Sequence, residues 1–321
     1  FYLGYTLLSI SAVFWVRNVS WKLAALAGLG VTALPLYAMM GIESYTSMLV
    51  LMVIGGSGMG IVYSLATTIL SDSSNPDRVF GIKLAVETMP GTALLFLLPM
   101  YVIPTWGFNG VALVMGVFAT VAVLCIFWIP KRSQRQETQI STTQNQQSSA
   151  ESTLMVWLGL AALTLYFIAV VCPWVFLQFI GESINLAPDD IGGVLSIGLF
   201  ISIIGGFVAA AVGTRFGHVP PMLITMGTLF AALIILAKAQ TLTSFTIGSF
   251  MLLSTLNIAL SYLLGITARV DKSGRLIVLS TAAIAGAVII GPSIAGNLII
   301  DGNFTPMLWF SGACGASSLA L

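Results

Sequence analysis

The number of long apolar stretches most constrains what this chain can fold into. About 20 apolar residues cross the hydrocarbon core of a bilayer as an α-helix. Such stretches lie at about 1 to 16, 23 to 40, 45 to 70, 79 to 103, 107 to 130, 153 to 180, 191 to 213, 219 to 237, 242 to 268, 276 to 300 and 304 to 321. Because lipid cannot satisfy exposed backbone groups, and because the stretches lack the alternation of a membrane barrel, we predict helices. The expected fold is an all-α membrane protein with about 11 transmembrane helices.

Composition agrees with a membrane protein and excludes several other classes. Hydrophobic residues make up 58% of the chain, charged residues only 7%, and the mean hydropathy is +1.02. The net charge of +1 leaves no basic surface for nucleic acid. Cys125, Cys172 and Cys314 lie in apolar stretches without paired spacing or a neighbouring histidine. We therefore expect no metal, no cofactor and no nucleic-acid partner, but a lipid bilayer around the chain.

Basic residues indicate the orientation of the helices. If the stretches cross alternately, Lys238 alone falls on one side, and the opposite side receives Arg17, Lys22, Arg78, Lys83, Lys131, Arg132, Arg135, Arg215, Arg269, Lys272 and Arg275. The positive-inside rule makes that side cytoplasmic. The polar stretch 131–152 then becomes a flexible cytoplasmic linker. With no extramembrane domain, the expected location is a plasma membrane, with a bacterial inner membrane as first choice.

Two pairs of basic turns indicate an internal repeat. Arg17 and Arg215 are separated by 215 − 17 = 198 residues, and Arg78 and Arg275 by 275 − 78 = 197. We predict two copies in the same orientation, an N-terminal bundle at 1–130 and a C-terminal bundle at 153–321, joined by the linker. The same shift places the stretch at 153 to 180 opposite a position before residue 1. We therefore expect two six-helix bundles, twelve spans in all, with the first span missing here and needed for activity.

Several short motifs carry a family resemblance. The turn "GTRFGH" at 213 to 218, the glycine-rich "GGSGMG" at 55 to 60 and the loop "ESINLAPDDIGGVLSIG" at 182 to 198 resemble the major facilitator superfamily (MFS) of secondary transporters. Thr214 stands where the family's turn has an acid. The resemblance implies alternating access between two bundles and a role in gating for the cytoplasmic turns. The residues concerned are Arg17, Arg78, Arg215, Gly217 and Arg275.

Glu87 is the only acid that the sequence places clearly inside a span. It follows Arg78 by nine residues, or about 13 Å of helix. An ionisable group at that depth is a candidate for handling protons or a charged substrate. Lys83, four residues earlier on the same face, offers a structural alternative in which the two side chains neutralise each other. Both interpretations of the pair stay open.

Polar and aromatic residues inside other spans are candidates to line a substrate cavity. Asn257 and Ser261 share a helical face, and Ser64 occupies the position that matches Ser261 at an offset of 197. Helix packing is the alternative for these three. In "CPWVFLQF", a proline accompanies two further candidates, although an interfacial tryptophan is equally expected there. These two are Trp174 and Gln178, and the remaining candidates are Tyr5 and Tyr63.

These residues bear on three candidate functions. The first is secondary transport of a small organic solute, with proton coupling, facilitated diffusion, import and export all open. The second is a transport-fold sensor or non-transporting protein. The third, a membrane-embedded enzyme, is disfavoured because the single histidine, His218, is expected to be a solvated turn residue without an acid cluster. Nothing in the sequence requires an oligomer, so we expect a monomer.

Overall fold

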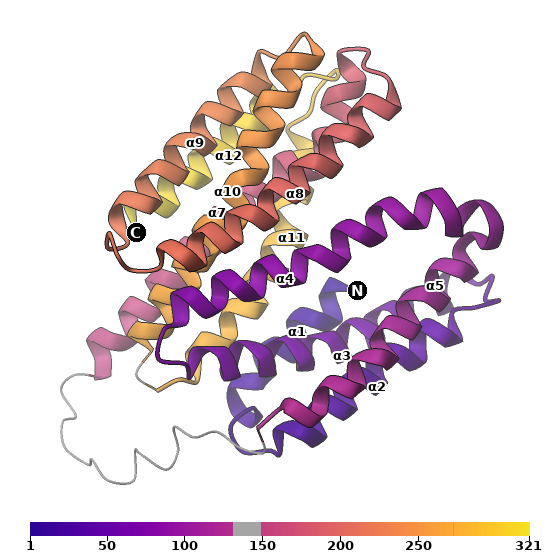
Figure 1. Ribbon diagram of the computed structural model, residues 1–321, viewed down its shortest axis with the longest axis vertical. Coiled ribbons are helices and arrows are strands. Elements are labelled where there is room, and N and C mark those ends of the chain that lie inside the picture. The colour runs from indigo at the N-terminus through magenta and orange to yellow at the C-terminus, as the bar shows by residue number, and fades with distance from the viewer. Residues whose placement is uncertain (131–148, 272) are drawn as a thin grey trace. The chain divides into compact units, whose positions relative to one another are not determined.

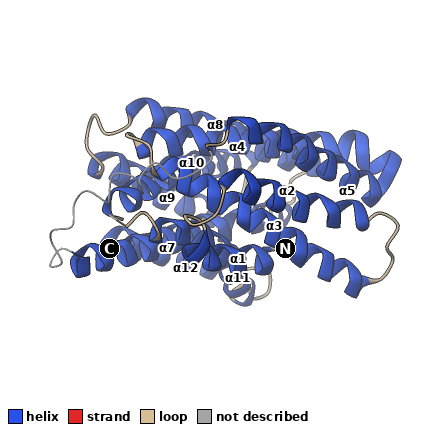
Figure 2. Cartoon of the chain, turned by 90° about the horizontal axis from the view of Figure 1, so that it is seen from below, coloured by secondary structure: helices blue, strands red, loops and turns tan. Residues whose placement is uncertain are grey.

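A computed structural model describes residues 1–130, 149–271 and 273–321. Residues 131–148, which form most of the predicted linker, and Lys272 lie outside the described residues. The described chain is helical (Figure 2), and it contains no β-strand apart from one isolated bridge between Ile300 and Asn303. The all-helical fold class is therefore confirmed.

The helices follow the apolar stretches (Figure 1). They are α1 (Tyr2–Trp15), α2 (Trp21–Ala38), α3 (Tyr45–Ser71), α4 (Pro76–Leu97), α5 (Ile103–Val121), α7 (Ser149–Ser183), α8 (Pro188–Val212), α9 (Val219–Ala237), α10 (Leu242–Val270), α11 (Leu279–Asn297) and α12 (Thr305–Ala320). Short π and 3-10 turns, Leu98–Val102, Ala122–Trp128 and Leu276–Val278, extend three of them.

The predicted count of about 11 transmembrane helices is not confirmed. Within the described residues, eight helical stretches are long and apolar enough to cross a membrane. One of them, Pro76–Trp128, joins two of the predicted spans into a single helical stretch of 53 residues. The break between them is confined to Gly107, whose φ of 56° and ψ of −144° are not helical. This residue lies at the boundary predicted between 79–103 and 107–130. The other two predicted spans outside the eight stretches are α1 and α12, which have only 14 and 16 residues.

Helix boundaries agree with the predicted repeat. Shifting α2 by 198 residues gives 21 + 198 = 219 and 38 + 198 = 236, against the observed Val219–Ala237 of α9. The same shift of α3 gives 243 to 269, against Leu242–Val270 of α10. The offset found in two pairs of arginines thus also relates whole helices.

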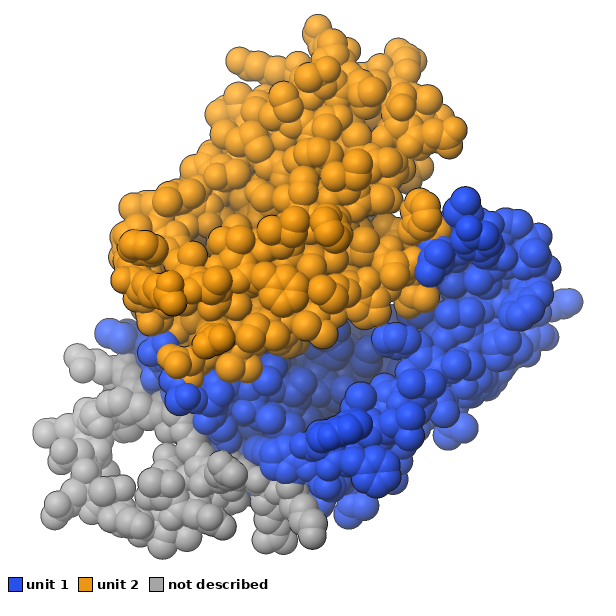
Figure 3. All heavy atoms as spheres, viewed as in Figure 1, with its two compact units in different colours: residues 1–74, 97–157, 268–286 blue, residues 75–96, 158–267, 287–321 orange. Residues whose placement is uncertain are grey.

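The chain divides into two compact units, coloured separately in Figure 3. Unit 1 contains 1–74, 97–157 and 268–286, and unit 2 contains 75–96, 158–267 and 287–321. These units are not the predicted bundles, because α4 groups with unit 2 and the start of α11 with unit 1. The domain boundaries at 130 and 153 stay a prediction.

In unit 1, the glycine-rich stretch of α3 lies against α1 and α2. A Cβ atom on Gly58 would stand 2.5 Å from the carbonyl oxygen of Gly28, and one on Gly60 would stand 2.6 Å from that of Tyr5. Backbones this close leave no room for a side chain, so "GGSGMG" is the packing surface of α3. Beside it lies an apolar core that includes Trp21.

In unit 2, buried tyrosines connect α10 to its neighbours. The Tyr166 hydroxyl of α7 donates to the Thr255 carbonyl at 2.6 Å, and the Tyr262 hydroxyl donates to the Gly213 carbonyl at 3.1 Å. Each buried aromatic ring therefore has its polar atom satisfied, as burial in an apolar core requires.

Candidate functional site

The predicted charge pair on α4 is present in unit 2. Lys83 Nζ lies 2.5 Å from Glu87 Oε2, and the side chains are 18% and 34% exposed. Glu87 is near the middle of α4, a helix of 22 residues. The spacing of four residues brings the two groups together on one face, as the sequence predicts. This contact leaves both the structural and the functional interpretation of the pair open.

Asn257 joins three helices next to this pair. It is 2% exposed, and its amide nitrogen donates to Thr88 Oγ1 at 3.0 Å and to the Ser202 carbonyl at 3.1 Å. Thr88 directly follows Glu87 on α4, so Asn257 of α10 contacts the same helix as the charge pair. We call Lys83, Glu87, Thr88 and Asn257 the α4–α10 polar cluster. It gathers a cation, an acid and two hydrogen-bonding groups within unit 2.

The remaining cavity candidates are divided between the two units. Ser261 donates to the Ile258 carbonyl of its own helix at 2.7 Å, which satisfies its hydroxyl. In unit 1, Tyr5 and Tyr63 pack edge to face with ring centroids 5.5 Å apart. Ser64 follows Tyr63, and its buried hydroxyl has no hydrogen-bond partner among the described residues. The structure thus brings Tyr5 and Tyr63 together within unit 1.

The two candidates on α7 lie in surroundings that do not by themselves indicate a binding site. Gln178 is exposed and donates to Glu182 Oε1 at 2.8 Å, one turn further along the helix. Trp174 is half-buried and follows Pro173, which lies inside a continuous helix. Among the described residues, neither side chain hydrogen-bonds to the α4–α10 polar cluster, and their substrate role stays a prediction.

Arg17 forms a network of contacts at the turn between α1 and α2 in unit 1. Its guanidinium donates to both carboxylate oxygens of Asp72 at 3.2 and 2.9 Å, and its Nε donates to the Gly274 carbonyl at 2.8 Å. The two side chains are only 7% and 12% exposed. A forked arginine–carboxylate pair of this kind fixes both position and orientation. It connects the start of α2 to the end of α3 and to the turn before α11.

Replacing Arg17 with glutamine should therefore destabilise the protein. Asp72 would be left as a partly buried acid without its forked partner, and breaking a buried pair on one side costs about 3–5 kcal/mol. Thermal unfolding of the purified protein would measure the loss. Arg275→Gln is the matched control, because Arg275 is exposed and its side chain makes no described ion pair. Equal melting temperatures for the two variants would contradict the structural role of Arg17.

The corresponding turn of unit 2 holds a pair that the sequence does not predict. His218 Nε2 lies 3.0 Å from Asp77 Oδ1, and the Asp77 side chain is 2% exposed. The expectation of a solvated His218 is therefore wrong, because the start of α4 brings a buried carboxylate to its ring. Gly217 has a φ of 72°, which glycine adopts without a steric penalty. Arg78, Arg215 and Arg275 are exposed.

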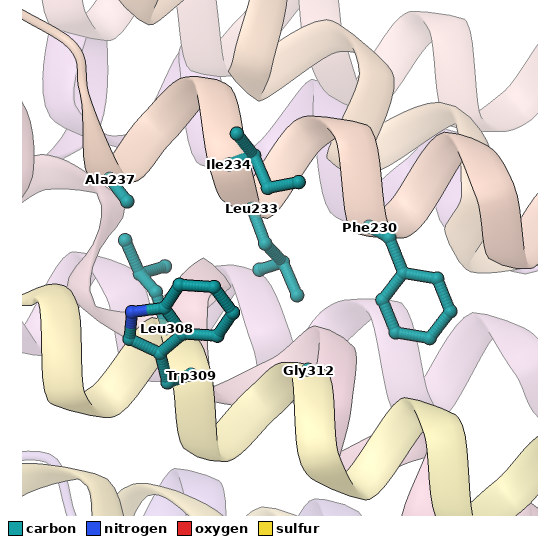
Figure 4. A pocket seen from close by; sticks show the side chains of 7 residues that line it. All are labelled: Phe230, Leu233, Ile234, Ala237, Leu308, Trp309 and Gly312. Atoms are coloured by element: carbon teal, nitrogen blue, oxygen red, sulfur yellow. The ribbon is translucent and has the colours of Figure 1, made fainter.

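An apolar cavity of about 70 Å³ lies between α9 and α12 (Figure 4). Leu233 of α9 and Leu308 and Trp309 of α12 point into it from opposite sides, and the surface of the cavity is entirely apolar. A cavity of this size and chemistry fits a packing defect or a lipid methyl group better than a polar solute. A polar solute needs charged and hydrogen-bonding groups, which the α4–α10 polar cluster supplies, so we place the candidate site there.

Comparisons with known proteins identify the fold. No family model matches the sequence, and no curated protein matches it. Solved structures do match. The human organic anion transporter MFSD10 has a TM-score of 0.79 at 17% identity, covering 99% of this chain and 80% of that one. The E. coli fucose:proton symporter FucP has a TM-score of 0.72 at 16% identity, covering 100% of this chain and 87% of that one. The MFS proton:xylose symporter XylE has a TM-score of 0.69 at 13% identity, covering 99% of this chain and 82% of that one.

Together these likenesses define the class of protein. The chain is a multi-pass membrane protein with the fold of MFS secondary transporters, as the sequence motifs predicted. The similar structures are described as transporters, and the absence of enzymatic activity in this chain stays a prediction.

Proposed function

We propose that this protein is a member of the major facilitator superfamily that moves a small organic solute by alternating access. The observation that carries the proposal is the α4–α10 polar cluster, in a fold that transporters share over at least 99% of this chain. An acid and a cation halfway along an apolar helix are costly, so their presence favours a functional role. In this proposal the cluster contacts the solute, and the two halves rock about it as a monomer in a bacterial inner membrane.

Proton coupling through Glu87 is the form of the mechanism that we favour. With Glu87 ionised, Lys83 holds the carboxylate. On protonation the carboxyl loses its charge, the attraction to Lys83 falls, and the ammonium group becomes available to an acceptor on the solute. Proton and solute would then bind together. Two of the similar structures are proton symporters, for fucose and for xylose, which supports this choice among transporters without identifying the solute.

The test begins with the full-length protein and a library of sugars, organic anions and amphipathic solutes. A solute that binds the native state raises the melting temperature by mass action. Each stabilising solute is then assayed for uptake into proteoliposomes with and without an imposed pH gradient. Uptake that rises with the gradient supports coupled transport. Binding without any flux would contradict the transport proposal and favour a sensor with a transporter fold.

Asn257 provides a local test of the candidate site. Asn257→Ala removes two interhelical hydrogen bonds, which in membrane proteins are worth about 0.6 kcal/mol each on average. We expect a modest fall in melting temperature, and a rise in the KM for transport if Asn257 also contacts the solute. Ser261→Ala is the matched control, because its hydroxyl bonds only within its own helix. A KM for Asn257→Ala equal to that of the control would remove Asn257 from the binding site.

A further inference from the structure

A polar cavity of about 400 Å³ opens at the end of unit 2 that carries the α8–α9 turn. It is lined by the start of α4, including Asn75, Asp77 and Arg78, and by the end of α8 with the following turn, including Gly213 and Arg215. The basic residues of this turn belong to the side that the positive-inside rule makes cytoplasmic. The cavity therefore lies where α4 and α8 are expected to leave the bilayer.

Two arginines against one acid give this cavity a net positive charge. Arg78 and Arg215 are both exposed, and neither side chain makes a hydrogen bond or ion pair with any described residue. The one acid in the lining, Asp77, faces His218, which lies 3.0 Å away. In the predicted repeat, Arg215 corresponds to Arg17, whose guanidinium forms an ion pair with Asp72. The guanidinium of Arg215 lacks such a partner and is free to bind an external anion.

An apolar cavity of about 570 Å³ adjoins the polar one. It lies along α8, α9 and α10, and its lining includes Val208, Phe216, Ile224 and Ile258. Val212 lines both cavities, so the charged and the apolar surfaces are continuous. A free phosphate could use only the first surface. A molecule with an anionic head and a hydrocarbon chain can use both.

We propose that this composite site binds an anionic glycerophospholipid of the cytoplasmic leaflet. Arg78 and Arg215 hold the phosphate, and one acyl chain lies along the apolar cavity. Arginine suits this ligand because its planar, forked donors match phosphate oxygens, and basic pockets between helices on this side of a membrane suit anionic headgroups. The site is separate from the α4–α10 polar cluster, so the proposal does not depend on transport.

Lipid binding to the purified full-length chain tests the proposal. Phosphatidylglycerol in nanodiscs or mixed micelles is titrated against phosphatidylcholine, and retained lipid is counted by native mass spectrometry. We expect wild type to prefer phosphatidylglycerol, and Arg78→Gln with Arg215→Gln to weaken that binding by about fivefold for each arginine removed. Ile224→Asn should weaken it through the apolar cavity. Arg275→Gln, an exposed arginine outside the site, is the control and should bind like wild type.

Soluble glycerol phosphate separates the two sources of a phosphate group. If it binds as tightly as phosphatidylglycerol, the site takes a soluble anion and the lipid proposal is overturned. Equal binding of the two lipids, or unchanged binding by the double arginine variant, overturns it as well. Should that variant not fold, the salt dependence of wild-type binding decides. Binding through exposed arginines must weaken as salt rises, whereas salt-independent binding contradicts the proposal.

Discussion

Glu87→Gln is expected to abolish accumulation of the solute while leaving the protein folded. A carboxamide keeps the size and hydrogen-bonding capacity of the carboxyl but cannot exchange a proton. A pH gradient of one unit supplies about 1.4 kcal/mol per proton, enough for about tenfold accumulation with one proton per solute. In proteoliposomes, wild type should approach that ratio, and Glu87→Gln should only equilibrate the solute. Exchange of labelled for unlabelled solute should persist in the variant.

Lys83 distinguishes the two interpretations of the pair. If the pair only neutralises charge, Lys83→Gln and Glu87→Gln should each lower the melting temperature, the double variant should recover it, and accumulation should follow stability. If Glu87 carries the proton, the double variant stays unable to accumulate solute even when its stability is restored. Tenfold accumulation by Glu87→Gln would remove Glu87 from the coupling mechanism altogether.

Local patterns account for what could be predicted from the sequence. Apolar length predicted nearly every helix, and two arginine pairs predicted the offset that relates α2 to α9 and α3 to α10. The Lys83–Glu87 contact was predictable because four residues on a helix always share a face. The break at Gly107 falls at the boundary predicted between the stretches 79–103 and 107–130. The count of spans was too high because α1 and α12 are short and because α4 and α5 form one helical stretch.

Contacts between distant segments could not be predicted. Arg17 and Asp72 are 55 residues apart, His218 and Asp77 are 141 apart, and Asn257 and Thr88 are 169 apart. Each pair depends on which helices become neighbours, which hydrophobic periodicity does not specify. A weak signal was present for two of the acids. They stand in "SDSSNPDR", directly after an apolar stretch, where a carboxylate can reach a basic turn.

The turns related by the predicted offset use their charged residues differently. Arg17 and Arg215 occupy equivalent positions, but the first is almost fully buried against an acid and the second is exposed. An acid equivalent to Asp72 exists at Asp271, since 271 − 72 = 199. Its carboxylate instead accepts backbone N–H groups of Gly274 and Ile277 at 2.9 and 2.7 Å. The same residue type thus serves as an ion-pair partner in one half and as a turn cap in the other.

Gly58→Ala is expected to prevent stable folding of unit 1. The added Cβ would meet the Gly28 carbonyl oxygen at 2.5 Å and the Thr32 backbone nitrogen at 2.6 Å. Since these are backbone atoms of α2, no side-chain rotation relieves the contact, and the helices must separate along their length. Overpacking typically costs about 1–3 kcal/mol, and a backbone contact belongs at or above the upper end. Folded yield and melting temperature in detergent would both fall.

Gly30→Ala on α2 makes the comparison a test of packing rather than of helix propensity. A Cβ at Gly30 meets nothing within 4 Å. Alanine is favoured over glycine inside a helix by about 1 kcal/mol, so this variant should be as stable as wild type or more so. Substitution of glycine by alanine would then lower the stability of the protein at Gly58 and preserve or raise it at Gly30, although both residues belong to the α2–α3 pair. If both variants were tolerated, α2 and α3 would not pack backbone to backbone, and the glycine-rich stretch would need another explanation.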